Sequence, residues 1–555
     1  MKTNKLTYII SVIAAVILIN VLASYVFKRF DLTKDNRYTL SETTKNIIDS
    51  ADTPLIIDIF LEGDLPSEFK LLQTETKQLI EEFQTLNPLL KVNYIDPLAD
   101  EANRDNIIRE LTKTGLEPYV NSKKVSGKVT QELLFPWGFA SYKNRTVKIP
   151  LFKKSITEDL QTQVANSVQQ LEYNFADAFS QLTKEKSKTV AVLKGNGQLS
   201  DIYIADFLQT IKPYYNIAPF TLDSVATNPV STLKKIKNYD LIISAKPSEA
   251  FTEEEKLVLD QYTMSGGKSI WLTESVIMDR DSLYNDNGSS VSIGRDLNLT
   301  DFFFKYGVRV NQNLVKDLYS APIPLAIGEG NNTQFQPVQW QYSPLAKADN
   351  NHPISDNIDL VKFDFASQID TLKNTVNKTI LLQSSDRTKL EGPLKTISLS
   401  SVTQQPDVEN YTEGNQNLAV LLEGNFTSVY KNRVLPFEIE NFLDKSESTK
   451  MVIISDGDVI KNEVSRNRPM QLGFERITGK TFGNKEFLLN AVNYLLDDTG
   501  LINIRAKSVE IAFLDSEKTE AQKTTWQFIN LVLPLVILGI FGLLFNFIRK
   551  RKYTR

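Results

Sequence analysis

The sequence predicts a membrane-anchored α/β protein. Two terminal transmembrane helices are expected to flank a thioredoxin-like α/β domain and a larger Rossmann-like parallel α/β domain with a β-rich insertion. Long uncharged apolar runs occur at both ends, and strand and helix patterns alternate between them. With 41% hydrophobic and 23% charged residues, the 555-residue chain has the composition of a globular protein, and its length fits two to four domains at roughly 150 residues each.

Composition excludes several classes of function. The chain has no cysteine, so thiolate nucleophiles, disulfides, cysteine-bound metals and redox cysteine pairs cannot occur. Its single histidine, His352, lies in the loop NNHPIS without a G-x-S-x-G elbow, which favours a packing role over a catalytic one. A formal charge of −4 gives no general attraction for nucleic acid. We therefore expect neither an enzyme nor a bound cofactor.

The N-terminal anchor is assigned to residues 1–28. The run LTYIISVIAAVILINVLASYVF, residues 6–27, has no charge and is long enough for a hydrocarbon core of about 30 Å. A cleaved signal peptide is the alternative, but its apolar core is usually about 7–15 residues long, and no A-x-A site follows here.

The C-terminal span is assigned to residues 524–548, followed by a basic tail, 549–555. By the positive-inside rule this tail is cytoplasmic, so two spans place both termini in the cytoplasm and the bulk of the chain outside the inner membrane. Lys28, Arg29, Lys34 and Arg37 after the first span oppose this orientation, but long translocated domains tolerate such charges.

Two residues of the C-terminal span are candidate contacts with the membrane or a partner. Trp526 lies near one boundary, and Pro534 removes a helical hydrogen bond, which is tolerated where a neighbouring helix packs alongside. A plain anchor with a harmless proline is the alternative.

The first domain is expected after a juxtamembrane linker, 29–50, in which Ser41 caps a short helix. Residues 51–153 contain a β-α-β unit and a hairpin around Lys143-Asn144, an order that resembles a thioredoxin-like fold without its redox cysteines. A connecting helix within 154–187 acts as a spacer or packing helix.

The second domain, 188–508, shows renewed alternation of strands and helices, which indicates a parallel sheet. The expected strands are 188–197 together with its turn, 215–222, 239–246, 268–274 and 451–460, and the expected helices are 200–211, 252–267 and 485–498. A β-rich insertion is placed around 330–450 and a linker at 509–523.

A glycine-containing turn is the first candidate ligand site. Gly195, Asn196 and Gly197 follow a strand and precede a helix, where backbone N–H groups could approach a phosphate or carboxylate. The full G-x-G-x-x-G pattern is absent, and glycines are equally required by a tight turn alone. Gly266-Gly267 is interpreted as a helix C-cap, because the P-loop spacing is missing.

Two aspartates form the second candidate site. Asp456 and Asp458, in SDGD, follow a buried strand, where carboxylates could help bind a solute or hold a magnesium or calcium ion. A structural Asp/Gly turn is the simpler interpretation, so no metal site is predicted.

The chain resembles the gliding-associated ABC transporter auxiliary proteins of the GldG family of Bacteroidetes. The segments that carry the resemblance are RFDLTKDNRYTLS, MSGGKSIWLTE, NHPIS, LLEGNFTSVYKNR, SDGDVIKNE and GNKEFLLNAVNYLLDDTGLINIRAK. It implies a substrate-binding-like auxiliary subunit that works with a GldF-like permease and a GldA-like ATPase in gliding motility. It also implies that the larger domain is GIFT-like, related to glutamine-amidotransferase-like folds whose nucleophilic cysteine is absent here.

Three hypotheses follow. The first is a non-catalytic extracytoplasmic ABC transporter subunit. The second is an autonomous membrane-tethered binding protein for a small anionic solute or sugar, and the third is a hydrolase that uses Asp456 and Asp458.

Overall fold

The computed structural model describes residues 5–25, 39–125, 128–327, 334–348, 352–476, 478–507 and 516–553. The chain divides into two compact units, Met1–Ser508 and Val509–Arg555. Lys28, Arg29, Lys34 and Arg37, residues 509–515 of the predicted linker 509–523 and the last two residues of the basic tail lie outside the described residues.

The described part of the second unit, residues 516–553, is helical and includes the predicted C-terminal span. Helix α11, Ser516–Ala521, precedes α12, Lys523–Tyr553. Within the described residues, one helical segment, Lys523–Lys552, is long and apolar enough to cross a membrane, and none of its most apolar window is buried. At the other end, α1, Lys5–Tyr25, has a shorter described apolar stretch, Ser11–Asn20, so the N-terminal span stays a prediction.

The elements from α2 to α5 form the first lobe of unit 1. Its four-stranded sheet has the order β2-β1-β5-β6, in which β1 and β2 are parallel and the other pairs are antiparallel. The bounds are α2 Glu42–Asp49, β1 Leu55–Ile59, α3 Ser67–Leu86, β2 Leu90–Tyr94, α4 Arg104–Lys113, β3 Tyr119–Val125, β4 Lys128–Leu134, β5 Trp137–Tyr142, β6 Arg145–Pro150 and α5 Leu160–Thr183. The predicted β-α-β unit and hairpin are thus present, while the thioredoxin-like assignment stays a prediction.

Two local predictions in this lobe can be checked directly. Ser41 caps α2, because its side chain accepts a hydrogen bond from Thr44 N. The expected spacer helix is α5, and it packs into the lobe: the ring of Phe83 on α3 lies 5.6 Å from the rings of both Phe175 and Phe179. The packing interpretation of this helix is therefore the one that the structure supports.

The second lobe, the elements from β7 to α10, is built on a seven-stranded sheet of order β19-β22-β23-β10-β9-β7-β8. Its strands are β7 Thr189–Lys194, β8 Asn216–Thr221, β9 Leu241–Ala245, β10 Lys268–Leu272, β19 Asn377–Gln383, β22 Asn417–Thr427 and β23 Lys445–Ile454. Five neighbouring strands of this sheet, β8, β7, β9, β10 and β23, are parallel. Strands β22 and β19 extend the sheet beyond β23 in antiparallel pairing. The predicted parallel sheet is therefore a mixed one.

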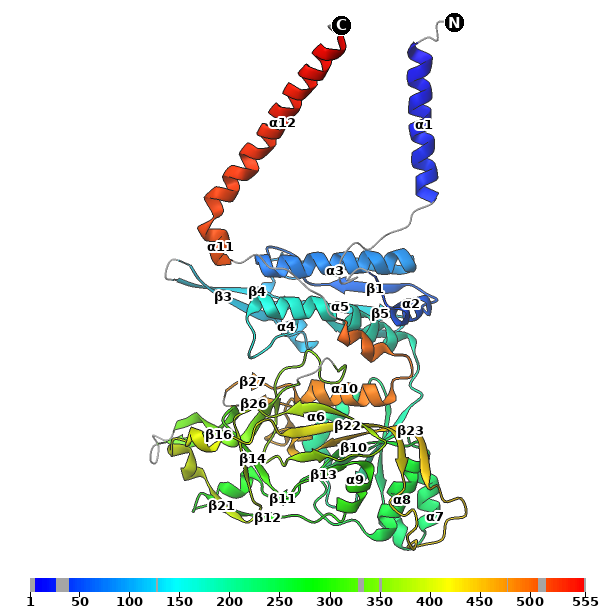
Figure 1. Cartoon of the computed structure of the whole chain (residues 1–555), viewed down its shortest axis with the longest axis vertical. Helices are drawn as coiled ribbons and strands as arrows, with labels where there is room; N and C mark the ends of the chain where they lie inside the picture. Colours follow the sequence, from blue (N-terminus) through cyan, green and yellow to red (C-terminus); the bar gives the residue numbers. More distant parts are fainter. Residues whose placement is uncertain are drawn as a thin grey trace. The chain divides into compact units, whose positions relative to one another are not determined.

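Helices cover both faces of this sheet (Figure 1). Helices α6, Asp201–Ile211, and α10, Asn484–Leu496, pack on one face. Three others pack on the opposite face: α7 Pro229–Ile236, α8 Glu253–Met264 and α9 Thr300–Tyr306. Alternate strand residues point to opposite faces of a sheet, so each strand contributes to both cores.

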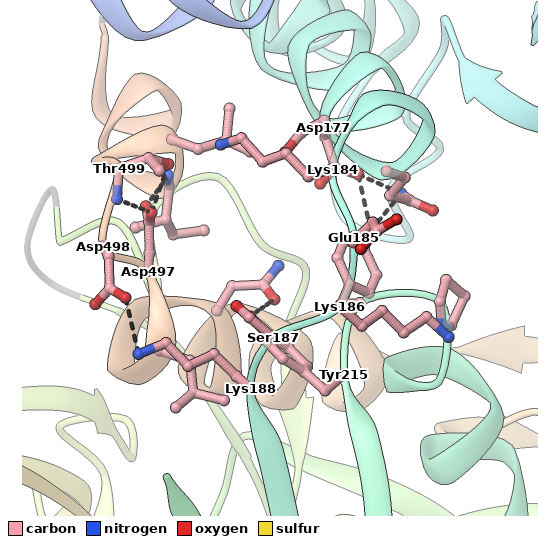
Figure 2. Close-up of a pocket in the computed structure, with 18 of the residues that line it drawn as sticks. Asp177, Lys184, Glu185, Lys186, Ser187, Lys188, Tyr215, Asp497, Asp498 and Thr499 are labelled. Carbon is pink, nitrogen blue, oxygen red and sulfur yellow. Dashed lines mark hydrogen bonds and ion pairs between the residues drawn. The ribbon is translucent and has the colours of Figure 1, made fainter. Parts of the chain in front are cut away.

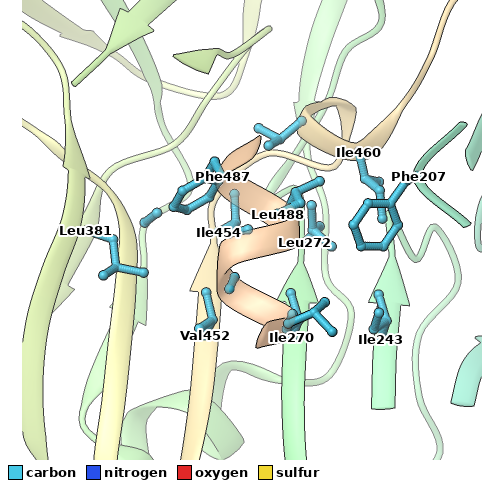
Figure 3. Close-up of a cluster of buried hydrophobic side chains, with 14 of the residues drawn as sticks. Phe207, Ile243, Ile270, Leu272, Leu381, Val452, Ile454, Ile460, Phe487 and Leu488 are labelled. Carbon is cyan, nitrogen blue, oxygen red and sulfur yellow. The ribbon is translucent and has the colours of Figure 1, made fainter. Parts of the chain in front are cut away.

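The core under α10 shows this alternation in detail (Figure 3). Phe487 and Leu488 of α10 lie over the side chains of Leu272 and Ile454, all of them fully buried. Trp271, the neighbour of Leu272, belongs to the other core. Both faces of the sheet are thus closed, and its carboxyl edge is left for a site.

The β-rich region differs from the predicted insertion at 330–450. It begins at Val276, and two of the strands inside the predicted range, β19 and β22, belong to the central sheet. The reason is the buried run Leu418–Leu422, which fits an interior strand. The small strands are β11 Val276–Ile277, β12 Ser289–Gly294, β13 Val308–Val310, β14 Leu314–Asp317, β15 Ser320–Ile327, β16 Gln334–Ala346, β17 Val361–Lys362, β18 Ile369–Thr371, β20 Thr388–Glu391 and β21 Lys395–Ser398.

Short elements complete the second lobe. Two small hairpins follow β23: β24 Val464–Ser465 with β25 Arg468–Pro469, and β26 Phe474–Glu475 with β27 Lys480–Thr481. The short 3₁₀ helices are η1 Asp223–Ala226, η2 Arg280–Leu283, η4 Leu399–Thr403, η5 Val408–Asn410, η6 Asp458–Ile460 and η7 Leu501–Ala506.

Candidate functional site

Five charged side chains gather at the carboxyl edge of the central sheet, and we call them the edge cluster. Lys246 follows β9, Glu274 and Asp279 follow β10, and Asp456 and Asp458 follow β23. Because parallel strands end at the same edge, residues more than 200 positions apart meet there. This edge is where α/β sheets usually bind ligands.

The Lys246 ammonium is the centre of the edge cluster. Its Nζ lies 2.9 Å from Glu274 Oε1, 2.6 Å from Asp279 Oδ1 and 2.8 Å from Asp458 Oδ1. Lys246 and Glu274 are 8% and 4% exposed, respectively, so these charges are paired in a region from which water is largely excluded. Lys246 is thus the cation that the three carboxylates share, while Arg295 Nη2 and Lys461 Nζ lie farther away, each 3.6 Å from Glu274 Oε2 and Asp458 Oδ1, respectively.

Asp456 serves a different purpose, because both of its oxygens accept backbone hydrogen bonds. Asp364 N donates to Oδ2 at 2.6 Å, and Asp458 N donates to Oδ1 at 2.7 Å. The side chain is fully buried. Asp456 therefore organises the loop that presents Asp458.

The excess of carboxylates shifts their protonation. Burial and the Asp458 carboxylate raise the pKa of Glu274 to about 8, although the Lys246 ammonium opposes this. Burial, with the charges of Asp458, Glu274 and Asp364, raises the pKa of Asp456 well above its ordinary value. Burial favours neutral Lys246, yet its three carboxylate partners raise the pKa of Lys246 overall. The cluster therefore holds protons at neutral pH.

Glu274, Asp456 and Asp458 could in principle hold a cation, since one oxygen from each lies within 4.8 Å of the others. Such oxygens suit magnesium or calcium. The Lys246 ammonium, however, already contacts Glu274 and Asp458. Its positive charge takes the place that a metal ion would need.

The Gly195–Gly197 turn lies at the end of β7, two strands from Glu274 in the sheet. Both glycines have positive φ, 110° and 68°, so the turn needs them for its backbone alone. Asn196 O accepts hydrogen bonds from Ser248 N and Glu249 N, and a Cβ at Gly197 would lie 2.0 Å from Ser248 Oγ. The neighbouring loop thus packs against the face that an anion would have to approach.

A cavity of about 690 Å³ opens beside the edge cluster, and we call it the edge cavity. A smaller cavity of about 80 Å³ continues from it toward Lys362, Asp364 and Asp458. The lining of the edge cavity is Tyr203, Arg280, Asp281, Tyr284, Pro324, Phe335, Lys461, Asn462, Glu463, Val464, Arg466, Asn467, Glu475 and Arg476.

A second pocket lies between the end of α5, residues 184–188 and the end of α10, with a volume of about 180 Å³ (Figure 2). Asp177 Oδ2 accepts hydrogen bonds from Tyr214 OH at 2.8 Å and Gln181 Nε2 at 2.9 Å. Burial raises the pKa of Asp177 to about 6. Lys188 Nζ lies 2.9 Å from Asp498 Oδ2. These groups satisfy one another, which indicates a junction between the lobes.

An interlobe cluster joins the same two lobes. Glu486 on α10 accepts from Lys153 Nζ at 2.9 Å and from Arg505 Nη2 at 2.7 Å. The Arg505 guanidinium also lies over the ring of Tyr173 on α5, 5.0 Å from its centroid. Lys153, Glu486 and Arg505 thus connect the segment after β6, α10 and η7.

The other predicted residues lie apart from the edge cluster. The His352 ring contacts the Tyr494 ring at 4.7 Å, and its Nδ1 accepts from Ile354 N at 3.3 Å, as expected for a packing histidine. Trp526 and Pro534 lie on α12, in the other unit, and Trp526 is 55% exposed.

Of the candidate residues, the sequence identified Asp456 and Asp458, and it missed Lys246, Glu274 and Arg280. The signal was available, since Lys246 and Glu274 are the charged last residues of two predicted strands, 239–246 and 268–274. Their pairing depends on strand order, which alternation alone does not reveal.

Comparison with known proteins identifies the family of the chain. Residues 187–491, more than half of the chain, match the model described as "ABC-type uncharacterized transport system". Residues 34–141 match a domain of unknown function.

The chain is also similar to an uncharacterized protein of Borreliella burgdorferi, with 22% identity over 532 residues that cover 94% of each chain. Among solved structures, the mmIFT52 N-terminal domain has 13% identity and a TM-score of 0.30, and the match covers 56% of this chain and 98% of that one. By the match over residues 187–491, the chain belongs to the family of ABC-type uncharacterized transport system auxiliary proteins.

Proposed function

We propose that the protein is a non-catalytic auxiliary subunit of an ABC transport complex, anchored in the inner membrane with both lobes on the extracytoplasmic side. The observation that carries this proposal is α12. Its apolar stretch is as long as a bilayer requires and is not covered by the rest of the described chain. Such a helix needs lipid or the helices of a partner.

The orientation follows from charge. Arg549, Lys550, Arg551 and Lys552 favour a cytoplasmic C-terminus, and a second span at residues 6–27 then returns the N-terminus to the cytoplasm. The intervening lobes face the other side, where a transported ligand or a moving permease can be contacted.

Pro534 and Trp526 are the proposed partner or membrane contacts. Pro534 has no N–H to donate to the carbonyl of Asn530 inside α12. A neighbouring permease helix can supply that donor. Trp526 near the end of the apolar stretch suits the membrane interface.

A non-catalytic role is supported by the edge cluster. The Lys246 ammonium is committed to three carboxylates, and both Asp456 oxygens are committed to backbone N–H groups. Neither side chain is free to act as a base, which weighs against a hydrolase that uses Asp456 and Asp458.

The partners are proposed by resemblance. A GldF-like permease and a GldA-like ATPase would complete the complex, and gliding motility would be the process it serves. ATP hydrolysis is assigned to the other subunit because the chain has no P-loop of the required spacing.

The test is a pull-down of the tagged full-length protein from its native membrane in mild detergent. Its matched variant carries an unrelated apolar helix in place of residues 524–548 and keeps the basic tail. We expect the native protein to recover a permease and an ATPase and the variant to lose them. Recovery of neither by the native protein, while other ABC complexes survive, would contradict the proposal.

An autonomous tethered binding protein is the alternative. It shares the anchor and would be recovered alone. In that case the Gly195–Gly197 turn and the Asp456–Asp458 loop become the first residues to test for a small anionic solute or sugar.

A further inference from the structure

The edge cavity has the size of a small-molecule site. Its volume of about 690 Å³ lies within the usual range of roughly 300–1,000 Å³. Segments from five parts of the chain border it: α6, η2, the β15–β16 hairpin, residues 461–467 with the β24–β25 turn, and the end of β26. A floor with polar groups continues into the smaller cavity next to Asp458.

Two cations in this floor have unused hydrogen-bond donors. Arg280 is 22% exposed, and its closest ion-pair contact, with Glu463 Oε1, is 3.6 Å long. Lys461 is 26% exposed, and its contacts with Asp458 and Asp281 are 3.6 and 3.8 Å long. These distances exceed those of hydrogen bonds, and neither side chain donates one within the described part of the chain. Partly buried donors of this kind gain when an acceptor arrives from solution.

Three carboxylates in the same region are already bonded. Asp458 Oδ1 lies 2.8 Å from Lys246 Nζ, and Asp364 accepts from Ser343 Oγ. Glu475 Oε2 accepts from Thr478 N and Oγ1 at 2.8 and 2.6 Å. Among the described residues, Asp281 and Glu463 have only the long contacts with Lys461 and Arg280. The lining of the edge cavity nevertheless holds four cations, Arg280, Lys461, Arg466 and Arg476, against the three carboxylates Asp281, Glu463 and Glu475, and this excess of positive charge favours an anion over a cation.

Aromatic rings form the upper walls of the edge cavity. Tyr203, Tyr284 and Phe335 are 39%, 49% and 63% exposed, unusually high for large aromatic side chains. Such surfaces suit a flat or ring-shaped body. The lining also includes Arg466 and Asn467, whose φ of 48° and 59° are those that the two-residue turn of the β24–β25 hairpin requires.

We propose that the edge cavity binds an organic anion in which a carboxylate or phosphate group is attached to a ring. Arg280 and Lys461 hold the anionic group, and Tyr203, Tyr284 and Phe335 contact the ring. Sugar acids and sugar phosphates share this chemistry. The inference deepens the proposed auxiliary role by naming its ligand class, yet it concerns this chain alone and does not require the transporter partners.

The test is calorimetric titration of the purified full-length protein in detergent with glucuronate and with glucose 6-phosphate. Neutral glucose and inorganic phosphate are the matched controls, each lacking one half of the proposed ligand. We expect one of the two ring anions to bind at least about tenfold more tightly than either control. A preference for glucuronate or for glucose 6-phosphate distinguishes the carboxylate from the phosphate source.

Variants locate the site. Arg280→Gln and Lys461→Gln should each weaken binding by about tenfold or more, because each removes a charged donor. Tyr284→Ala at the exposed rim should weaken it less and leaves the floor intact. Arg433→Gln is the control, since Arg433 pairs with Asp301 and does not line the edge cavity.

Two results would overturn the proposal. One is the absence of binding by both ring anions at about 10 mM, roughly ten times the weak end of usual enzyme–substrate affinities, about 1 mM. The other is binding that Arg280→Gln and Lys461→Gln leave unchanged while both variants stay folded. Failure here leaves the pull-down result intact, so the ligand and the transporter association are tested separately.

Discussion

The edge cluster and the interlobe cluster are both built from ion pairs between a carboxylate and a cation, but carboxylates are in excess in the first and cations in the second. At the sheet edge, one ammonium faces three carboxylates. Between the lobes, one carboxylate of Glu486 faces the two cations Lys153 and Arg505. The first arrangement raises the pKa of Glu274, whereas in the second the two cations lower the pKa of the partly buried Glu486. An acid-rich cluster titrates near neutral pH, and a cation-rich one stays ionised.

The surroundings of the two clusters differ as well. The edge cluster adjoins an open cavity, and its Lys246 has a backbone φ of 55°. In the interlobe cluster, Tyr173 packs against Arg505, and Lys153 is linked to residues more than 300 positions later in the chain. We infer that the first cluster shapes a site and the second fixes the lobes to each other.

The largest expected effect comes from removing the only cation in the edge cluster. Lys246→Met leaves Glu274 and Asp458 buried without their shared partner, which should lower the free energy of unfolding by about 3–5 kcal/mol. Urea unfolding followed by circular dichroism measures it. Lys113→Met is the control, since Lys113 forms an exposed pair with Glu110 and should change stability by less than about 1 kcal/mol. Equal losses in the two variants would show that the edge cluster is not a structural unit.

The corresponding change between the lobes is Glu486→Gln. It leaves Lys153 and Arg505 without a carboxylate, at a cost of about 2–3 kcal/mol because Glu486 keeps some contact with water. The lobes should separate more often, so trypsin should cut at Lys184, Lys186 or Lys188 several-fold faster. Glu110→Gln is the surface control. Unchanged cleavage would mean that Glu486 does not hold the lobes together.

A third variant tests packing around Lys246 without touching its charge. A Cβ at Gly457 would lie 2.9 Å from Lys246 Cα and closer still to its side-chain carbons. Gly457→Ala should therefore cost about 1–3 kcal/mol, the usual effect of overpacking. Gly392→Ala is the matched control, because a Cβ added at Gly392 would have no atom within 4 Å. If both alanines are tolerated equally, Lys246 is free to move and the edge cluster is less rigid than described.

The smallest expected effect is a change in pH dependence. The pKa of Glu274 is raised from its ordinary 4.5 to about 8, so the folded protein binds more protons than the unfolded chain between these values. The free energy of unfolding should then fall as pH rises from about 4.5 to about 8, and Asp456 adds to the same trend.

Glu274→Gln should remove part of this dependence. At pH 6 the variant should be close to the parent, and at pH 9 it should be more stable by about 1 kcal/mol, because it carries no buried charge. Thermal unfolding midpoints at the two pH values measure the difference. A variant that is less stable than the parent at pH 9 would show that the ionised Glu274 is needed to balance Lys246.

Much of the fold could be predicted from the sequence, because local patterns determine it. Period-two burial and continuous apolar runs located β1, β7, β9 and β10, and a serine cap located the start of α2. Helix α7 was not predicted, although it is as long as α2 and Asn228 caps it as Ser41 caps α2. Strand β22 was assigned to an insertion because only the structure reveals that it pairs with β23 in the central sheet.

The candidate site was predicted in part. Asp456 and Asp458 stood out as acidic residues after a buried strand, but their partner Lys246 lies more than 200 residues earlier. The Gly195–Gly197 turn stood out equally, although its glycines are explained by backbone angles and the close approach of Ser248. Residue type marks a candidate, whereas its partners decide its role.

By itself, the sequence determined the apolar C-terminal span, the α/β class and the absence of cysteine chemistry, since these depend on composition and short-range periodicity. Only the tertiary structure decided which charges meet. Ion pairing acts over a few ångströms in space, and the parallel sheet brings together strand ends whose separation along the chain carries no trace of that proximity.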